Sequence, residues 1–193
     1  RMLLSDAAEP LDPSVRLSIA LDVADAMLYL HTRNPPIIHR DLKSHNVFIQ
    51  EPAAGHFVAK VGDWGSARAV ALSGQRAMTH GIGTACWLAP EVIEHARSSK
   101  ASDVYAFGIV LWEIATRKEV HEELSAAQVL VRVAHEGLRP MVPRECNPPF
   151  GTLMRQCWGQ VPSKRPAFTQ IVSTLMQMHN RVAGGAGDGA AAG

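Results

Sequence analysis

The feature that most constrains this chain is a pair of short polar motifs within its first 65 residues. Residues 39–46 read His-Arg-Asp-Leu-Lys-Ser-His-Asn, and residues 63–65 read Asp-Trp-Gly. Phosphoryl transfer needs a carboxylate to orient the attacking hydroxyl, an amide and a second carboxylate to hold Mg²⁺, and a lysine to offset charge on the γ-phosphate. One side chain of each kind is present: Asp41, Asn46, Asp63 and Lys43.

A third motif, Ala-Pro-Glu at residues 89–91, follows in the same order along the chain. The series H-R-D-L-x-x-x-N, D-x-G and A-P-E resembles the signature set of the protein kinases. A single tripeptide is weak support, but three motifs in this order are specific. The resemblance extends from about Leu3 to Val182.

The parts of the kinase signature that cover the ATP phosphates do not occur before His39, where there is neither a G-x-G-x-x-G loop nor a strand lysine. The chain therefore resembles the large lobe alone. We expect a mainly α fold (α+β overall), that of a protein-kinase-like C-terminal lobe with a few short β-strands and the small lobe absent. Residues 1–182 would form this partial kinase domain, and residues 183–193, rich in Gly and Ala, a disordered tail. The chain is then either a fragment or a degenerate kinase, and it is expected to be inactive alone.

The resemblance implies a role for each polar residue of the first two motifs. Asp41 matches the catalytic aspartate, and Lys43 matches the second catalytic residue, which contacts the γ-phosphate of ATP. Asn46 and Asp63 match the two ligands of Mg²⁺, which binds hard oxygen atoms. The alternatives are an aspartate that caps a turn and a lysine that is simply solvated.

Residues 39–46 match the catalytic loop of the family, and the remaining residues of this loop suggest support and regulation. By resemblance, His39 lies in the core against the Asp-Trp-Gly motif. Arg40 matches the arginine that binds a phosphate on the activation segment, which lies between Asp63 and Glu91. Ser73 and Thr79 are the candidate sites of that phosphorylation. The alternative for Arg40 is an ordinary surface arginine.

The Asp-Trp-Gly motif departs from the family pattern at its middle residue. Trp64 replaces the usual phenylalanine, so a larger ring with an N–H must fit an apolar slot, while the flexible Gly65 remains. This change bears on the switch between active and inactive states more than on the chemistry.

Four further residues match supporting positions of the family. Thr84 matches the threonine that contacts the catalytic aspartate and lysine. Glu91 and Arg165 match a buried ion pair that holds the substrate-docking loop to the lobe. Asp103 matches the helix aspartate that braces the backbone of the catalytic loop.

The branch of the family is indicated by residues 42–46, 137–140 and 157–168, which resemble the tyrosine-kinase-like branch. Members of that branch mostly phosphorylate serine and threonine, and Lys43 and Thr84 favour this specificity. The first hypothesis is therefore an ATP-dependent serine/threonine kinase that acts on protein hydroxyls. The alternative is a pseudokinase-like scaffold, because a fold alone does not fix a function.

Apolar periodicity and capping signals predict the secondary structure. Asp12 and Pro13 mark a helix start, and Asn34-Pro35-Pro36 marks its end. Helices are expected at about 13–32, 102–116, 125–136, 149–158 and 168–181. Residues 37–38 form a short strand, and residues 47–49 and 57–61 a hairpin.

Composition limits the partners and the location. A net charge of +1 gives no reason to expect nucleic acid as a partner, and the longest apolar stretches are too short to span a bilayer. Three unclustered cysteines indicate reduced thiols and hence an intracellular, cytoplasmic location. The nine histidines have no metal-ligand spacing, so no zinc site is expected.

Overall fold

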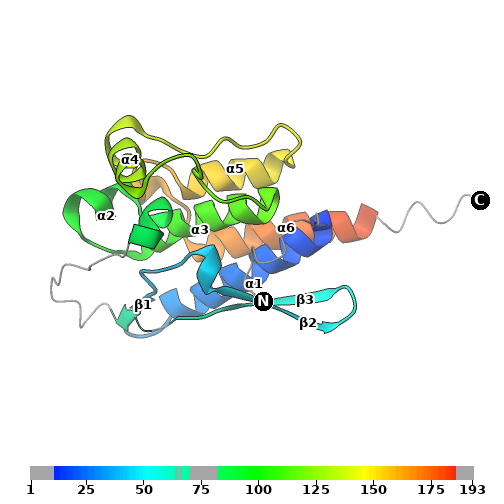
Figure 1. Ribbon diagram of the computed structural model, residues 1–193. Coiled ribbons are helices and arrows are strands. Elements are labelled where there is room, and N and C mark those ends of the chain that lie inside the picture. The colour runs from blue at the N-terminus through cyan, green and yellow to red at the C-terminus, as the bar shows by residue number, and fades with distance from the viewer. Residues whose placement is uncertain (1–10, 64, 66, 70–81, 186–193) are drawn as a thin grey trace, which may run out of the picture.

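The computed structural model describes residues 11–63, 65, 67–69 and 82–185 of the 193. Its longest helices are α1 (Pro13–His31), α3 (Lys100–Thr116), α5 (Pro148–Cys157) and α6 (Phe168–Gly185). Figure 1 shows α3 running through the middle of the lobe, with α5 on one side and the neighbouring pair α1 and α6 on the other. The expectation of a mainly helical fold with a few short strands is confirmed.

Helix α3 is the core of the lobe, because it is apolar around most of its circumference and is buried along nearly its whole length. It begins two residues before the expected start, and Ser99 and Ser102 explain why. The Ser99 hydroxyl accepts from Ser102 N at 3.2 Å, and the Ser102 hydroxyl accepts from Ser99 N at 2.8 Å. This reciprocal capping satisfies two backbone donors at the helix start.

Helix α1 begins at Pro13, as expected, and presents its buried face to α6. Asp12 occupies the position before the helix, but its side chain makes no capping hydrogen bond. The predicted helix start, with Asp12 before Pro13, is confirmed. Pro13, whose fixed φ suits a first helical turn, accounts for the start.

The strands form two small antiparallel pairs. β2 (Val47–Ala53) and β3 (His56–Val61) make the expected hairpin, with Val47 opposite Val61. The hairpin is fixed to α1, since the Asp22 carboxylate accepts from Ala59 N at 2.8 Å. β1 (Ile37–Ile38) pairs with β4 (Arg68–Ala69), a two-residue partner too short to show alternation in the sequence.

Shorter helical segments complete the lobe. These are the 3₁₀ turns η1 (Ser44–Asn46), η4 (Ile82–Trp87) and η6 (Pro162–Lys164), the helices α2 (Pro90–His95) and α4 (Ala126–Val131), and one π-helical turn, η5 (Arg132–Glu136). The helix expected at 125–136 is thus divided between α4 and η5. Helix α6 continues to Gly185, three residues into the stretch expected to be a disordered tail at 183–193. Within the described ranges, no helix has the length and apolar character needed to cross a bilayer.

Candidate active site

The loop between β1 and β2 is held to the central helix by one carboxylate. Asp103, in the first turn of α3, accepts from His39 N through Oδ2 and from Arg40 N through Oδ1, each at 2.9 Å. Its Oδ2 also lies 2.9 Å from Nε2 of His31 at the end of α1. Because Asp103 is only 2% exposed, these contacts fix the loop backbone in a site with little competing water.

His39 connects this loop to the segment that carries Asp63. Its ring is fully buried, and Nε2 donates to Gly62 O at 3.2 Å. Gly62 N in turn donates to Asn46 O at 2.8 Å. Through these two contacts Gly62, the residue before Asp63, meets both ends of the catalytic loop. His39 itself is buried in the core, as the family resemblance implies.

The structure brings together four of the residues singled out in the sequence. Lys43 Nζ donates to the Asp41 carboxylate, at 3.1 Å from Oδ1 and 2.9 Å from Oδ2, and to Thr84 Oγ1 at 3.1 Å. Thr84 Oγ1 donates to Asp41 Oδ1 at 3.3 Å. Asn46 Nδ2 donates to the backbone oxygen of Asp41 at 2.7 Å and to its Oδ2 at 3.2 Å. Asp41 is the common partner of the other three.

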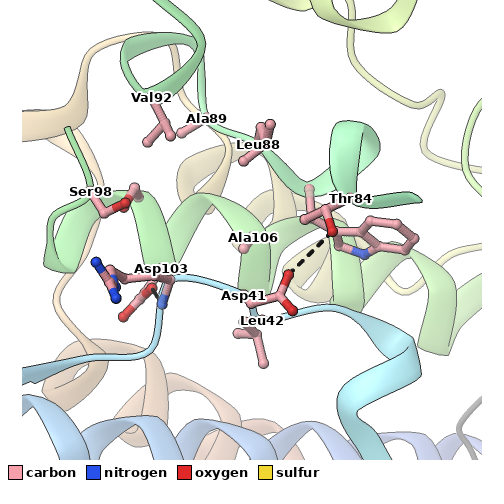
Figure 2. Close-up of a pocket in the computed structure, with 12 residues that line it drawn as sticks. Asp41, Leu42, Thr84, Leu88, Ala89, Val92, Ser98, Asp103 and Ala106 are labelled. Carbon is pink, nitrogen blue, oxygen red and sulfur yellow. Dashed lines mark hydrogen bonds between the residues drawn. The ribbon is translucent and has the colours of Figure 1, made fainter. Parts of the chain in front are cut away.

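The Asp41 carboxylate borders a small cavity of about 20 Å³. In Figure 2, Asp41 points toward Thr84, and Leu88, Ala89 and Val92 lie across the cavity from it. Polar and apolar residues line the recess about equally, and its volume is enough for about one water molecule beside the carboxylate.

Asp63 and Asn46 are the candidates for holding a cation. Asp63 is exposed and has φ of 59°, a left-handed conformation that is uncommon outside glycine and more often found at functional sites. Because the Asn46 amide nitrogen donates to Asp41, its oxygen is the atom left for a cation. Two hard oxygen donors on adjacent segments fit Mg²⁺, which needs few protein ligands and retains phosphate oxygens and water. The described residues hold no cluster of three or more His, Cys, Asp or Glu side chains that would bind a metal without phosphate.

Glu91 and Arg165 form a bidentate ion pair that fixes the start of α2 to the lobe. Arg165 Nη1 and Nη2 lie 2.7 and 2.8 Å from the two carboxylate oxygens. The same guanidinium donates to Gly159 O and Ala101 O, each at 2.8 Å. The Arg165 side chain has no exposed surface, so its charge is balanced by Glu91 rather than by water.

Several sequence expectations concern residues that the structure does not describe. Trp64, Ser73 and Thr79 lie outside the described residues. Gly65 is described and exposed, and a methyl group there would lie 3.4 Å from Asp63 Oδ1. Arg40 is half-buried with φ of 71°, and its backbone is held by Asp103.

The sequence reasoning missed one buried acidic residue near the site. Glu113 on α3 accepts from Ser44 Oγ at 2.8 Å and from Trp87 Nε1 at 2.9 Å. Burial raises its pKa to about 8, although both hydrogen bonds act to lower it. The available signal was a single charge within the otherwise apolar run at residues 104–115.

Comparison with known proteins shows the family to which the chain is similar. The family described as protein tyrosine and serine/threonine kinase matches residues 1–175. A probable LIM domain-containing serine/threonine-protein kinase of Dictyostelium discoideum is 44% identical over 178 residues, which are 92% of this chain and 26% of that protein. The serine/threonine-protein kinase CTR1 of Arabidopsis thaliana is 43% identical over 174 residues, which are 89% of this chain and 20% of that protein.

A second Arabidopsis thaliana relative, the serine/threonine-protein kinase STY17, is 43% identical over 166 residues, which are 86% of this chain and 28% of that protein. The chain thus spans about a quarter of the length of these relatives. The family match covers most of the 193 residues. This chain belongs to the protein tyrosine and serine/threonine kinase family.

Proposed function

We propose that this chain carries the catalytic lobe of an ATP- and Mg²⁺-dependent kinase that phosphorylates serine and threonine hydroxyls of proteins. The observation that carries the proposal is the sharing of one carboxylate, Asp41, among Lys43, Asn46 and Thr84. A scaffold without catalysis has no need for this arrangement. The names of the relatives, which are serine/threonine-protein kinases, support the same specificity.

Asp41 orients the substrate hydroxyl and accepts its proton as the hydroxyl oxygen bonds to the γ-phosphorus of ATP and the bond to the leaving phosphate oxygen breaks. The carboxylate is 13% exposed, so it faces the solvent-accessible side of the site while three donors fix its direction. Fixing the base in advance lowers the entropic cost of reaching the reactive geometry. Thr84, which holds Asp41 and has no proposed contact with the metal, is therefore expected to act on the rate more than on nucleotide affinity.

Lys43 is suited to balance the negative charge of the γ-phosphoryl group during its transfer. Its ammonium is a compact charge on a flexible stem and is 18% exposed, so it remains accessible to a ligand while bound to Asp41 and Thr84. Asn46 and Asp63 would hold Mg²⁺, which, when bound, offsets charge on the phosphate oxygens.

The proposed intracellular, cytoplasmic location is supported by the cysteines. Cys86, Cys146 and Cys157 are all free thiols, and burial raises the pKa of each. Free thiols are typical of reducing compartments.

Transfer of labelled phosphate from ATP to a mixture of protein substrates tests the proposed function. The 193 residues contain no Gly-rich phosphate loop, so we expect the 193-residue chain to be inactive alone. The assay therefore uses the longest protein that the gene encodes and compares it with the 193-residue chain. We expect phosphoserine and phosphothreonine, and loss of transfer when Mg²⁺ is chelated. Phosphotyrosine alone would contradict the specificity, and nucleotide binding without any transfer would favour the scaffold.

A further inference from the structure

Glu113 is a carboxylate inside α3, only 1% exposed, that contacts two separate segments of the site. Its Oε1 accepts from Ser44 Oγ at 2.8 Å, and its Oε2 accepts from Trp87 Nε1 at 2.9 Å. Ser44 follows Lys43 in the catalytic loop, and Trp87 ends η4, the turn that contains Thr84. One side chain therefore joins the two segments whose residues meet at the Lys43–Thr84 contact.

This link is reinforced by the surroundings of Trp87. The indole is 8% exposed, and the His45 ring of the catalytic loop meets it edge-on with the ring centroids 5.6 Å apart. Trp87 therefore contacts the catalytic loop directly as well as through Glu113. The bonds of Arg165, by contrast, run to Glu91, Gly159 and Ala101, so that ion pair fixes a different part of the chain.

Stability alone gives no reason for a carboxylate at this position. A buried ionisable group is costly, and replacing such groups by well-packed apolar ones is often neutral or stabilising. Both oxygens are already occupied and almost no surface is exposed, so Glu113 is not available to bind a substrate. What the residue supplies is a pair of directed hydrogen bonds between α3, the catalytic loop and η4.

We propose that Glu113 is a positioning residue that sets the separation between the catalytic loop and η4, and so holds Thr84 against Lys43 and Asp41. Its consequence for catalysis rests on the proposed function, whereas its effect on the two segments does not. Glu113 acts through Ser44 and Trp87 and does not touch the reacting atoms.

Substitutions of Glu113 distinguish the effect of its two hydrogen bonds from the effect of its ionisable carboxyl group. Glu113→Gln keeps both links, because the amide oxygen accepts from Trp87 and the amide nitrogen donates to the Ser44 hydroxyl. Glu113→Ala removes both. Tyr105→Phe is a matched control, since Tyr105 Oη is a buried oxygen on the same helix for which the described residues offer no hydrogen-bond partner.

Amide hydrogen exchange of the full 193-residue chain measures the link without any need for activity. In Glu113→Ala we expect the amides of residues 39–46 and 82–89 to exchange about 10- to 100-fold faster, because a buried side-chain hydrogen bond is lost from each segment. The amides of α6 should not change. Glu113→Gln and Tyr105→Phe should stay within about threefold of the wild type.

Variants that each remove only one of the two hydrogen bonds to Glu113 keep the test decisive if Glu113→Ala fails to fold. Trp87→Phe removes the bond from η4, and Ser44→Ala removes the bond from the catalytic loop. If Glu113 joins the segments, each substitution should also speed exchange in the segment that it does not alter. Exchange that rises only in the altered segment, or uniformly through α6, would overturn the proposal.

The activity of the longest protein that the gene encodes gives the second measurement. Glu113→Ala should lower kcat by at least about tenfold while the KM for ATP stays nearly constant, and Glu113→Gln should restore kcat. If the wild-type protein transfers no phosphate, the proposed function is contradicted. The amide hydrogen exchange of Glu113→Ala then decides by itself whether Glu113 has the positioning role. Faster exchange in neither segment, with kinase activity intact, would contradict the positioning role alone.

Discussion

Lys43 Nζ lies 3.1 Å from Thr84 Oγ1, and both groups contact the carboxylate of Asp41. Forty-one positions separate the two residues in the chain, so the contact exists only when the catalytic loop and η4 are packed together on α3. A hydroxyl from one segment and an ammonium from another thus fix the same carboxylate. The position of the proposed base therefore depends on the docking of η4.

Thr84→Val should lower the rate of phosphate transfer more than the affinity for ATP. Valine preserves the shape of this buried side chain but removes the hydroxyl that bonds to Asp41 and Lys43. We expect kcat to fall about tenfold or more, with KM for ATP nearly unchanged, because only the positioning of the base is affected. Thr84→Ser is the control, since it keeps the hydroxyl and should retain most of the activity. Equal kcat values for the valine and serine variants would argue against a role for this hydroxyl.

Arg165→Ala should destabilise the lobe strongly. The substitution strands the Glu91 carboxylate and removes two further bonds to backbone oxygens, at a cost of about 3–5 kcal/mol in the free energy of unfolding. The control is Arg132→Ala, which breaks the exposed pair with Glu136 and should cost less than about 1 kcal/mol. Urea unfolding of the two variants and the wild type measures both values, and similar costs would contradict the structural role of Arg165.

Local sequence patterns predicted much of this lobe, because the information they need is local. The spacing of Asp41, Lys43 and Asn46 places them on one short loop, and apolar periodicity located the four longest helices to within about four residues, whereas the helix expected at 125–136 is divided between α4 and η5. Proline and the serine cap account for the starts of α1 and α3.

Local sequence patterns did not predict the contacts between distant segments. Only the family resemblance suggested some of them. The bond from Trp87 to Glu113 spans 26 positions, and the bond from Ser44 spans 69. The pairing of β1 with β4 involves two residues on each side, too few to produce a pattern. Such contacts depend on how helices and turns pack, and neither periodicity nor capping encodes that packing.

Gly108→Ala should destabilise the contact between α3 and α5. A methyl group at Gly108 would lie 2.9 Å from Cys157 Cβ and 3.1 Å from Trp158 N, neither of which is a flexible chain end. Overpacking costs about 1–3 kcal/mol, which exceeds the gain of about 0.5–1 kcal/mol from replacing glycine in a helix. Gly151→Ala in α5 is the matched control, because its nearest neighbour is the side-chain atom Cγ1 of Val142, at 3.0 Å. Thermal unfolding should show the larger loss for Gly108→Ala, and the reverse order would contradict this packing argument.

The pH dependence of stability should carry a contribution from Glu113. Burial raises its pKa from 4.5 to about 8, and Glu119 adds to the shift. Between these pH values the folded protein keeps a proton that the unfolded chain has released, so the free energy of unfolding falls as the pH rises. Below this window the carboxyl is protonated in both states, and above it the full cost of the buried charge is present.

Glu113→Gln should remove this contribution because an amide does not titrate. Urea unfolding at several pH values should give a stability difference, variant minus wild type, that grows between pH 4.5 and about 8 and is level on either side. Two curves that remain parallel across this range would contradict the assignment of the titration to Glu113.

The most direct test of the account is the effect of Asp41→Asn on the longest protein that the gene encodes. Asp41 is assigned to the hydroxyl and not to the nucleotide, so phosphate transfer should fall by about 10²–10⁴-fold or more while the affinity for ATP with Mg²⁺ stays nearly constant. Asp63→Asn should instead weaken Mg²⁺-dependent nucleotide binding. Asp25→Asn, the same change on the exposed face of α1, serves as the control and should alter neither quantity. Near-complete loss of transfer with retained ATP binding is the predicted result for Asp41→Asn, and full transfer activity in that variant would contradict the account.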